Sequence, residues 1–208
     1  MSEIRSLSQL MTDLKHSMSG DDVRLGTLLE QLHERGFGAV LLLFAAPMAL
    51  PIPVPPGINI ALATPLLLLT AQQVIGRHTI WLPEKLRQSA LPRTKIEGLI
   101  DAMLPWLKRL ELLTKPRMGW ITQNGPSCFF GFLGLLMALA VCVPVPLTNT
   151  VPSLGIALMA VGTLMRDGLA TLVGAIIGMA WVTMLVGAVI IFGPEAFDIV
   201  KETIKSFL

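Results

Sequence analysis

Long blocks without a charged residue are the feature that most constrains how this chain folds. Two of them run from Gly38 to Leu50 and from Leu169 to Phe192. A block of about 20 apolar residues matches the hydrocarbon thickness of a bilayer. Only 14% of the 208 residues are charged, whereas a soluble domain usually carries about a quarter. The chain is therefore expected to be an all-α integral membrane protein.

Most of the apolar sequence is arranged as two hairpins, each interrupted by prolines. The interruptions are Pro51-Ile52-Pro53-Val54-Pro55-Pro56-Gly57 and Pro144-Val145-Pro146-Leu147-Thr148-Asn149. Proline removes a backbone donor and clashes with the preceding turn, so neither run continues a helix. The apolar stretches on either side are residues 37–50 and 58–75 in the first copy, and 129–143 and 151–165 in the second. The similarity predicts an internal duplication of Pro-broken hairpins, which either span the bilayer or re-enter it.

This pattern divides the chain into six segments. Residues 1–35 are predicted to form an N-terminal cytoplasmic arm and amphipathic helix, with residues 1–20 flexible, Asp21 and Asp22 capping the helix and Gly36 ending it. The others are a first hairpin at 36–76, a cytoplasmic or interfacial amphipathic segment at 77–125, a second hairpin at 126–167, a C-terminal transmembrane helix at 168–193 and an amphipathic tail at 194–208.

The segment between the hairpins carries an apolar stripe at helical spacing and recurring tryptophans. The stripe consists of Ile96, Leu99, Ile100, Met103, Leu107 and Leu110, and the tryptophans are Trp81, Trp106 and Trp120. Tryptophan favours the bilayer interface, and a basic amphipathic helix lies in its plane. The segment is therefore predicted to lie on the membrane surface.

Lysine and arginine predict the orientation in the membrane. They gather in the N-terminal arm and in residues 77–117, and only Lys201 and Lys205 lie beyond the last apolar block. Cytoplasmic loops carry an excess of these residues. The N-terminus is therefore expected to be cytoplasmic in a multi-pass protein of the bacterial inner membrane. Re-entrant hairpins would give the same sidedness.

The two proline breaks are the candidate functional site. Broken helices leave backbone groups that protein, water or a ligand must satisfy, and helix N-termini attract anions. Paired Pro-interrupted segments in two halves are typical of a transporter site. The predicted substrate or ion path comprises Pro53, Pro55, Gly57, Asn59, Thr64, Pro144, Pro146, Thr148, Asn149, Thr150 and Pro152. The alternatives are tight extracytoplasmic turns with capped helix starts and, for Asn59 and Thr64, simple hydrogen bonds between helices.

Arg166 and Asp167 are a second candidate. Inside the bilayer they would form an ion pair or polar gate, whereas at the membrane boundary they are a loop, which Gly168 favours. The histidines lack metal-ligand spacing, and Cys128 and Cys142 sit as small hydrophobes within an apolar helix. Because no catalytic, cofactor, metal or nucleic-acid motif is visible, we expect no enzymatic activity.

Several motifs, taken in order, are shared with one known family. The chain resembles the exopolysaccharide synthesis family ExoD over roughly residues 20–192. The motifs are the Pro-x-Pro-x-Pro-Pro-Gly break, Gly76-Arg77 followed by Trp81-Leu82-Pro83, Leu104-Pro105-Trp106-Leu107-Lys108-Arg109-Leu110-Glu111, Pro116-Arg117, the Pro-x-Pro-x-x-Asn-x-x-Pro run to Pro152, and Arg166-Asp167-Gly168. The resemblance implies a bacterial inner-membrane protein linked to exopolysaccharide production, and it implies no catalytic mechanism.

Two functions are compatible with these features. The first is a small transporter or flippase-like protein that supports exopolysaccharide synthesis. Its partners would be membrane lipids and a lipid-linked sugar, an anion or a coupling ion, and small-residue faces make a homodimer possible. The second is a non-transporting assembly factor for the polysaccharide synthesis machinery, in which the breaks are structural and the amphipathic segment recruits enzymes.

Overall fold

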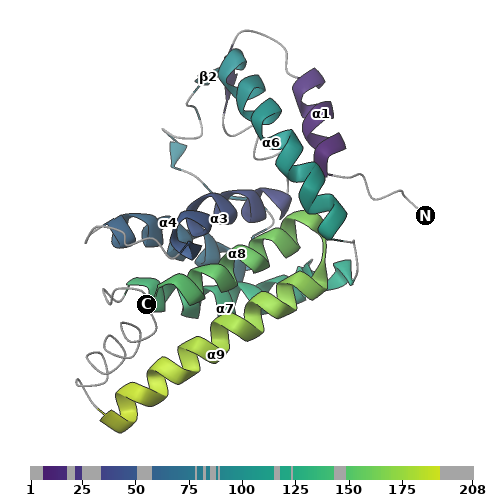
Figure 1. Cartoon of the computed structure of the whole chain (residues 1–208). Helices are drawn as coiled ribbons and strands as arrows, with labels where there is room; N and C mark the ends of the chain where they lie inside the picture. The colour runs from purple at the N-terminus through teal and green to yellow at the C-terminus, as the bar shows by residue number, and fades with distance from the viewer. Residues whose placement is uncertain are drawn as a thin grey trace.

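Apolar helices packed side by side make up most of this computed structural model. The structure describes residues 7–17, 22–24, 34–50, 58–77, 79–81, 83–84, 88, 90–114, 118–122, 124–142 and 149–192. Among them the apolar helices are α3 (Glu34–Ala49), α4 (Ile58–Val74), α7 (Asn124–Cys142), α8 (Thr150–Met165) and α9 (Gly168–Phe192). Helix α3 packs mainly on α8, α4 on α7, and α9 on α8 (Figure 1). The shared core includes Phe37, Leu66, Met137 and Ile156.

Glycines show how the helices of the two hairpins run past one another. A Cβ on Gly38 of α3 would lie 2.7 Å from the carbonyl oxygen of Ala160 in α8. A Cβ on Gly131 of α7 would lie 2.7 Å from the Cβ of Gln73 in α4. The starts of α3 and α7 therefore lie against the ends of α8 and α4, so both pairs are antiparallel. The side chains of Met48, Ala63 and Val141 cluster at the opposite end.

These contacts define two ends of the bundle. At the break end, α3 and α7 end and α4 and α8 begin, so both proline breaks follow helices that finish there. At the turn end, α4 and α8 end and α9 begins. The break residues 51–57 and 143–148 themselves lie outside the described part of the chain.

Helices α4 and α8 end in the same kind of turn. After α4, Gly76 has φ 76°, its N–H donates to the carbonyl of Gln73 (2.9 Å), and the next N–H donates to that of Gln72 (3.1 Å). After α8, Arg166 has φ 55°, its N–H donates to Thr163 (3.4 Å), and the next N–H donates to Gly162 (2.8 Å). Each is a Schellman turn around a left-handed residue.

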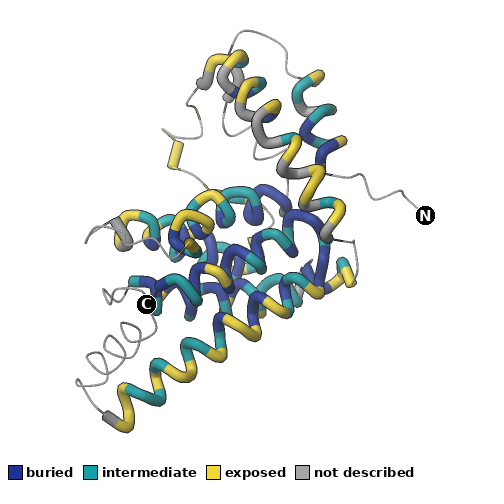
Figure 2. Tube along the Cα trace, viewed as in Figure 1, coloured by how far each residue is buried: buried dark blue, intermediate teal, exposed yellow. Residues whose placement is uncertain are grey.

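Helix α9 is the longest apolar helix and the least covered. It has 25 residues, about 37 Å at 1.5 Å per residue, whereas the 16 residues of α8 span about 24 Å. Gly155 of α8 meets Gly174 and Gly178 of α9, and beyond this contact α9 runs clear of the bundle (Figure 1). Its distal part is exposed (Figure 2), with Ile190 78% exposed. Among the described helices, α9 is the one long and apolar enough to cross a membrane.

A smaller arm rises from the turn end. Helix α1 (Leu7–Ser17) pairs with α6 (Arg93–Leu113), and strand β1 (Asp22–Arg24) pairs antiparallel with β2 (Ala90–Pro92). In Figure 1 the α1–α6 pair stands steeply to the apolar helices. A cluster of buried apolar side chains joins the arm to the end of α8, and it consists of Met11, Ile96, Ile100, Leu164 and Met165.

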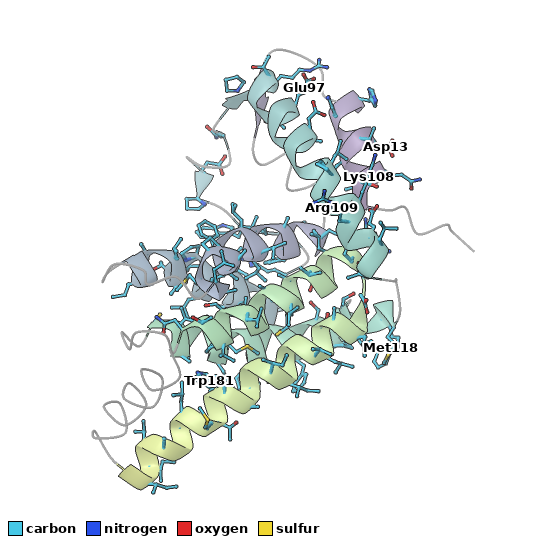
Figure 3. The ribbon with its side chains drawn as sticks, in the orientation of Figure 1. Asp13, Glu97, Lys108, Arg109, Met118 and Trp181 are labelled. Carbon is cyan, nitrogen blue, oxygen red and sulfur yellow. The ribbon has the colours of Figure 1, made fainter. Side chains whose placement is uncertain are left out.

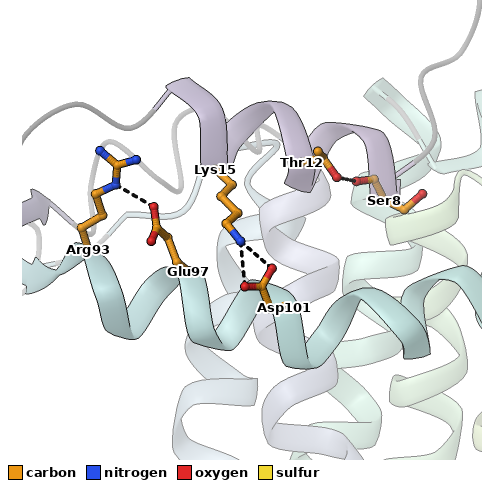
Figure 4. Close-up of polar contacts among 6 residues, drawn as sticks. All are labelled: Ser8, Thr12, Lys15, Arg93, Glu97 and Asp101. Carbon is orange, nitrogen blue, oxygen red and sulfur yellow. Dashed lines mark hydrogen bonds and ion pairs between the residues drawn. The ribbon is translucent and has the colours of Figure 1, made fainter.

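Polar contacts also hold the arm together. The charged side chains labelled in Figure 3 all lie in this arm, and they are Asp13, Glu97, Lys108 and Arg109. The ammonium of Lys15 lies 2.7 Å from both carboxylate oxygens of Asp101 (Figure 4). The Ser8 backbone N–H and hydroxyl donate to the two carboxylate oxygens of Glu111 at 2.7 and 2.8 Å. Exposed ion pairs contribute about 0–1 kcal/mol each. Apolar packing therefore supplies most of the stability of the α1–α6 contact.

The sequence-based prediction for the N-terminal segment and its end at Gly36 is wrong in three respects. Residues 7–17 form α1 rather than a flexible arm, and Asp22 lies in strand β1 rather than capping a helix. Gly36 lies inside α3 and does not end a helix; residues 25–33 lie outside the described residues. The strand depends on pairing with residues 90–92, which local periodicity does not reveal. Ile96 and Ile100, predicted to face the membrane, pack against the arm and α8.

Candidate functional site

Two buried polar side chains mark the break end of α8. Asn149 occupies the N-cap position and is 6% exposed, and Ser153 lies one turn later and is 0% exposed. The Asn149 side chain makes no capping hydrogen bond. Its Oδ1 and the Ser153 Oγ have no hydrogen-bond partner among the described residues. Positions four apart share a helix face, so these groups form one site, named here the Asn149–Ser153 site.

An unpaired buried polar group is costly, at about 1–3 kcal/mol, and each one in a folded protein calls for an explanation. The first turn of α8 adds backbone N–H groups that have no partner within the helix. The Ser153 N–H makes the first intrahelical bond, to the carbonyl of Asn149 at 3.1 Å. Pro152 has no N–H, so Thr150 and Val151 carry the N–H groups without an acceptor inside the helix. A carboxamide oxygen accepts, whereas a hydroxyl both donates and accepts. The arrangement suits a hydroxyl-bearing or anionic group bound at a helix N-terminus.

The structure brings together only part of the predicted path. Asn149 and Pro152 are buried and Thr150 half-buried at the start of α8. Thr64 is exposed on α4, and its hydroxyl donates to the carbonyl of Ile60 at 2.7 Å. Asn59 lies in the first turn of α4, but its side chain lies outside the described residues. The remaining predicted positions also lie outside them, namely Pro53, Pro55, Gly57, Pro144, Pro146 and Thr148.

Arg166 and Asp167 lie at the turn end, away from the breaks. Asp167 is 5% exposed, and its Oδ1 accepts from the N–H groups of Leu169 (3.0 Å) and Ala170 (3.4 Å) at the start of α9. Arg166 supplies the left-handed residue of the turn. Asp167 therefore acts as the N-cap of α9, in keeping with the loop interpretation of this pair.

We expect Asp167→Ala to cost about 0.5–2 kcal/mol of stability, the usual loss at a helix N-cap. Asp167→Asn keeps an acceptor oxygen at the same place and should lose only a few tenths. Thermal unfolding of both purified variants tests this expectation. A polar gate predicts instead that both variants lose function, because both remove the charge even though asparagine keeps the cap. Loss of exopolysaccharide production in a folded, stable Asp167→Asn protein would contradict a purely capping role.

A second polar site lies at the turn end and was missed by the sequence reasoning. A small cavity there is bordered on one side by apolar residues such as Leu41, Phe130 and Met159. Its polar lining comes from α4, the short helix η1 (Gly119–Thr122), α7, α8 and α9. These polar residues are Thr70, Gln73, Thr122, Ser127, Thr163 and Thr171. Threonine and serine within apolar helices could have indicated a polar site. Which of them line the same cavity depends on how the helices pack, which the sequence does not show.

Comparison with known proteins gives consistent results. A protein-family model described as "Exopolysaccharide synthesis, ExoD" matches residues 7–187. An uncharacterised protein of Synechocystis sp. is 33% identical over 190 residues, which cover 89% of this chain and 89% of that protein. Protein ExoD of Rhizobium meliloti is 26% identical over 172 residues, which cover 79% of this chain and 70% of that protein. No solved structure matches the chain.

Proposed function

The chain belongs to the exopolysaccharide synthesis family ExoD, and from that premise we propose that it is a small transporter or flippase-like protein of the bacterial inner membrane. In this proposal it is a multi-pass protein with a cytoplasmic N-terminus. The Asn149–Ser153 site binds the transported group, and the two Pro-broken hairpins form the path. The group that moves along this path supports exopolysaccharide production.

Membrane insertion is supported by the outer surface of the apolar helices. Large apolar side chains are exposed on several of them, including Leu68, Phe132, Ile176 and Ile190. Soluble monomers seldom expose extensive apolar patches. Residues 36–50, 58–75, 124–142 and 149–165 contain no charged residue. Trp81 and Trp120, exposed by 56% and 65%, flank the turn end, where an aromatic belt would meet the cytoplasmic interface.

The internal duplication is supported by reciprocal packing. In both cases the first helix of one hairpin packs on the second helix of the other, since α3 packs on α8 and α7 packs on α4. Both are major contacts of the bundle. Glycines mediate both, since Gly38 meets Ala160 in one and Gly134 meets Thr70 in the other. The matching Schellman turns after α4 and α8 add a third correspondence. Because the helices that flank both breaks meet at one end of the bundle, the hairpins would be parallel repeats about an axis along the membrane normal.

The observation that carries the transport proposal is that the buried Asn149 and Ser153 oxygens have no hydrogen-bond partner among the described residues. In a purely structural turn, apolar residues of similar shape would leave the stability unchanged or raise it. A structural role therefore does not explain two buried oxygens that lack partners among the described residues. A transported ligand would satisfy both oxygens during part of the cycle. A sugar hydroxyl can donate to Asn149 Oδ1, and a sugar or phosphate oxygen can accept from the Ser153 hydroxyl.

The test is reconstitution of the purified full chain in proteoliposomes. Movement of a fluorescent lipid-linked sugar, inorganic anions and monovalent cations would be measured across the membrane. Wild type should move at least one of these, and Ser153→Ala should slow that movement. Thr64→Val is the matched control. Thr64 was among the predicted path residues, but its side chain is exposed and bonds only within its own helix in the described structure, so the proposed path leaves it out. No movement of any probe by folded wild type would overturn the proposal.

The assembly-factor alternative makes a different prediction in cells. It expects Asn149→Ala to leave exopolysaccharide production intact, whereas changes along the face of α6 between Leu99 and Leu110 would abolish it. A transport path predicts instead that Asn149→Ala lowers production, whereas changes along the face of α6 are tolerated. Exopolysaccharide yield from a complemented deletion strain, with protein amounts matched by immunoblot, separates the two functions.

A further inference from the structure

We propose that the cavity at the turn end, named here the threonine cavity, binds a single dehydrated monovalent cation of about the size of Na⁺. Its polar lining consists of Thr70, Gln73, Thr122, Ser127, Thr163 and Thr171. The inference does not rest on the proposed transport function. The cavity lies at the turn end, whereas the Asn149–Ser153 site lies at the break end.

The protons of the threonine hydroxyls in this cavity are already engaged. Thr70 donates to the carbonyl of Leu66 at 2.7 Å, and Thr163 donates to that of Met159 at 3.0 Å. In the same way Thr122 and Thr171 donate to carbonyls of their own helices at 3.0 and 3.2 Å. A hydroxyl has one proton and two lone pairs. With the proton used within the helix, each oxygen is left to accept or to coordinate.

The charge of the lining then limits the ligand. The described residues that line the cavity include no aspartate, glutamate, lysine, arginine or histidine. Ca²⁺ and Mg²⁺ sites in proteins use carboxylates. An anion would find donors on Gln73 and Ser127 alone in the described lining, because the threonine protons are already engaged. Among the described residues there is also no group of three His, Cys, Asp or Glu side chains for a transition metal. Neutral hydroxyl and carboxamide oxygens suit a single positive charge.

The size of the cavity limits the ligand further. It has room for about one water molecule, so it admits a bare small cation and excludes an organic solute. The helices around the cavity are closely packed, because a Cβ on Gly134 would lie 3.0 Å from the Thr70 methyl carbon. A Cβ on Gly162 would also collide with the Thr171 hydroxyl. The lining comes from both hairpins and α9, so a bound cation would join three parts of the fold.

Thermal unfolding of the purified full chain in detergent tests the proposal. The protein would be heated in NaCl, KCl or N-methyl-D-glucamine chloride at equal ionic strength. A ligand at about 100 times its Kd should raise Tm by about 5–10 °C for a protein of this size. We expect that rise in sodium over N-methyl-D-glucamine, with a saturating dose response and a smaller rise in potassium. Equal Tm in the three salts would overturn the proposal and leave water as the occupant. A larger rise in potassium would contradict the size argument.

Two variants locate the effect. Thr70→Val and Thr163→Val keep the side-chain shape but remove the oxygen, and each should lose most of the sodium-dependent rise in Tm. Thr64→Val is the matched control, since Thr64 is on the same helix as Thr70, makes the same kind of hydrogen bond to Ile60, and is exposed. A full sodium response in both cavity variants would place the cation elsewhere and overturn the assignment. The wild-type salt series decides the matter even if a variant fails to fold. Absence of transport in proteoliposomes would leave the sodium response unaffected.

Discussion

Alanine in place of Gly174 is expected to destabilise the protein by about 2–3 kcal/mol, as overpacking of a close helix contact does. A Cβ at this position would lie 2.6 Å from the carbonyl oxygen of Gly155 and 2.8 Å from the backbone nitrogen of Met159. Both are backbone atoms of α8, so they can move only if the whole α8–α9 contact opens. Thermal or denaturant unfolding of the purified protein measures the loss.

Gly187 on the same helix provides the control. A Cβ there meets nothing within 4 Å, so Gly187→Ala should leave stability unchanged or raise it by up to about 1 kcal/mol, the helix-propensity difference. The pair isolates the close contact from the general effect of alanine in a helix. Equal stability of the two variants would show that α8 and α9 are not in the contact described here.

Replacing Ser153 by alanine is expected to stabilise the protein and to impair its function. The Ser153 hydroxyl is fully buried with no partner among the described residues, and removing such a group should gain about 1 kcal/mol. Transport, or exopolysaccharide production in cells, should fall by about tenfold if the hydroxyl makes one hydrogen bond to a charged or polar ligand. Unfolding curves and flux measurements on one preparation test both effects together.

Measuring stability and function of Ser153→Ala together separates a ligand-binding role of the hydroxyl from a structural one. A hydroxyl with a hidden structural partner predicts that Ser153→Ala loses stability and that function falls only with the amount of folded protein. A hydroxyl without any role predicts a stable variant with full function. Thr64→Val, altered on the exposed surface of α4, should change neither property.

The sequence was sufficient to locate the apolar helices because their signal is local. Prolines and glycines bound α3, α4, α7 and α8 in the sequence, and the described helices end beside them. Helix α1 also had a local signal, since Leu7, Leu10, Met11 and Leu14 share one helical face. That signal was overlooked because the segment is polar in composition. The β1–β2 pair had no such signal, because it joins residues 22–24 to residues 90–92.

The candidate site was predictable in part for the same reason. Asn149 was identified from its position after a proline break, a local feature. Ser153 was missed because one serine inside an apolar helix usually bonds to its own backbone. The structure shows that its hydroxyl has no partner among the described residues. The threonine cavity was missed because Thr70, Thr163 and Thr171 come from three helices. The register between α8 and α9 depends on contacts such as that of Gly162 with Thr171, which periodicity does not encode.

Cysteine accessibility at position 153 tests most directly the claim that the Asn149–Ser153 site opens to a water-filled path. A single Ser153→Cys would be introduced into a Cys128→Ala, Cys142→Ala background and treated in membranes with a membrane-impermeant thiol reagent. Leu50→Cys, at an exposed break-end position (54% exposed), would serve as the reference. We expect position 153 to react, more slowly than position 50, because the buried site becomes accessible during the transport cycle. Complete protection of position 153 from both sides of the membrane, with position 50 reactive, would show a sealed core and contradict a transport path.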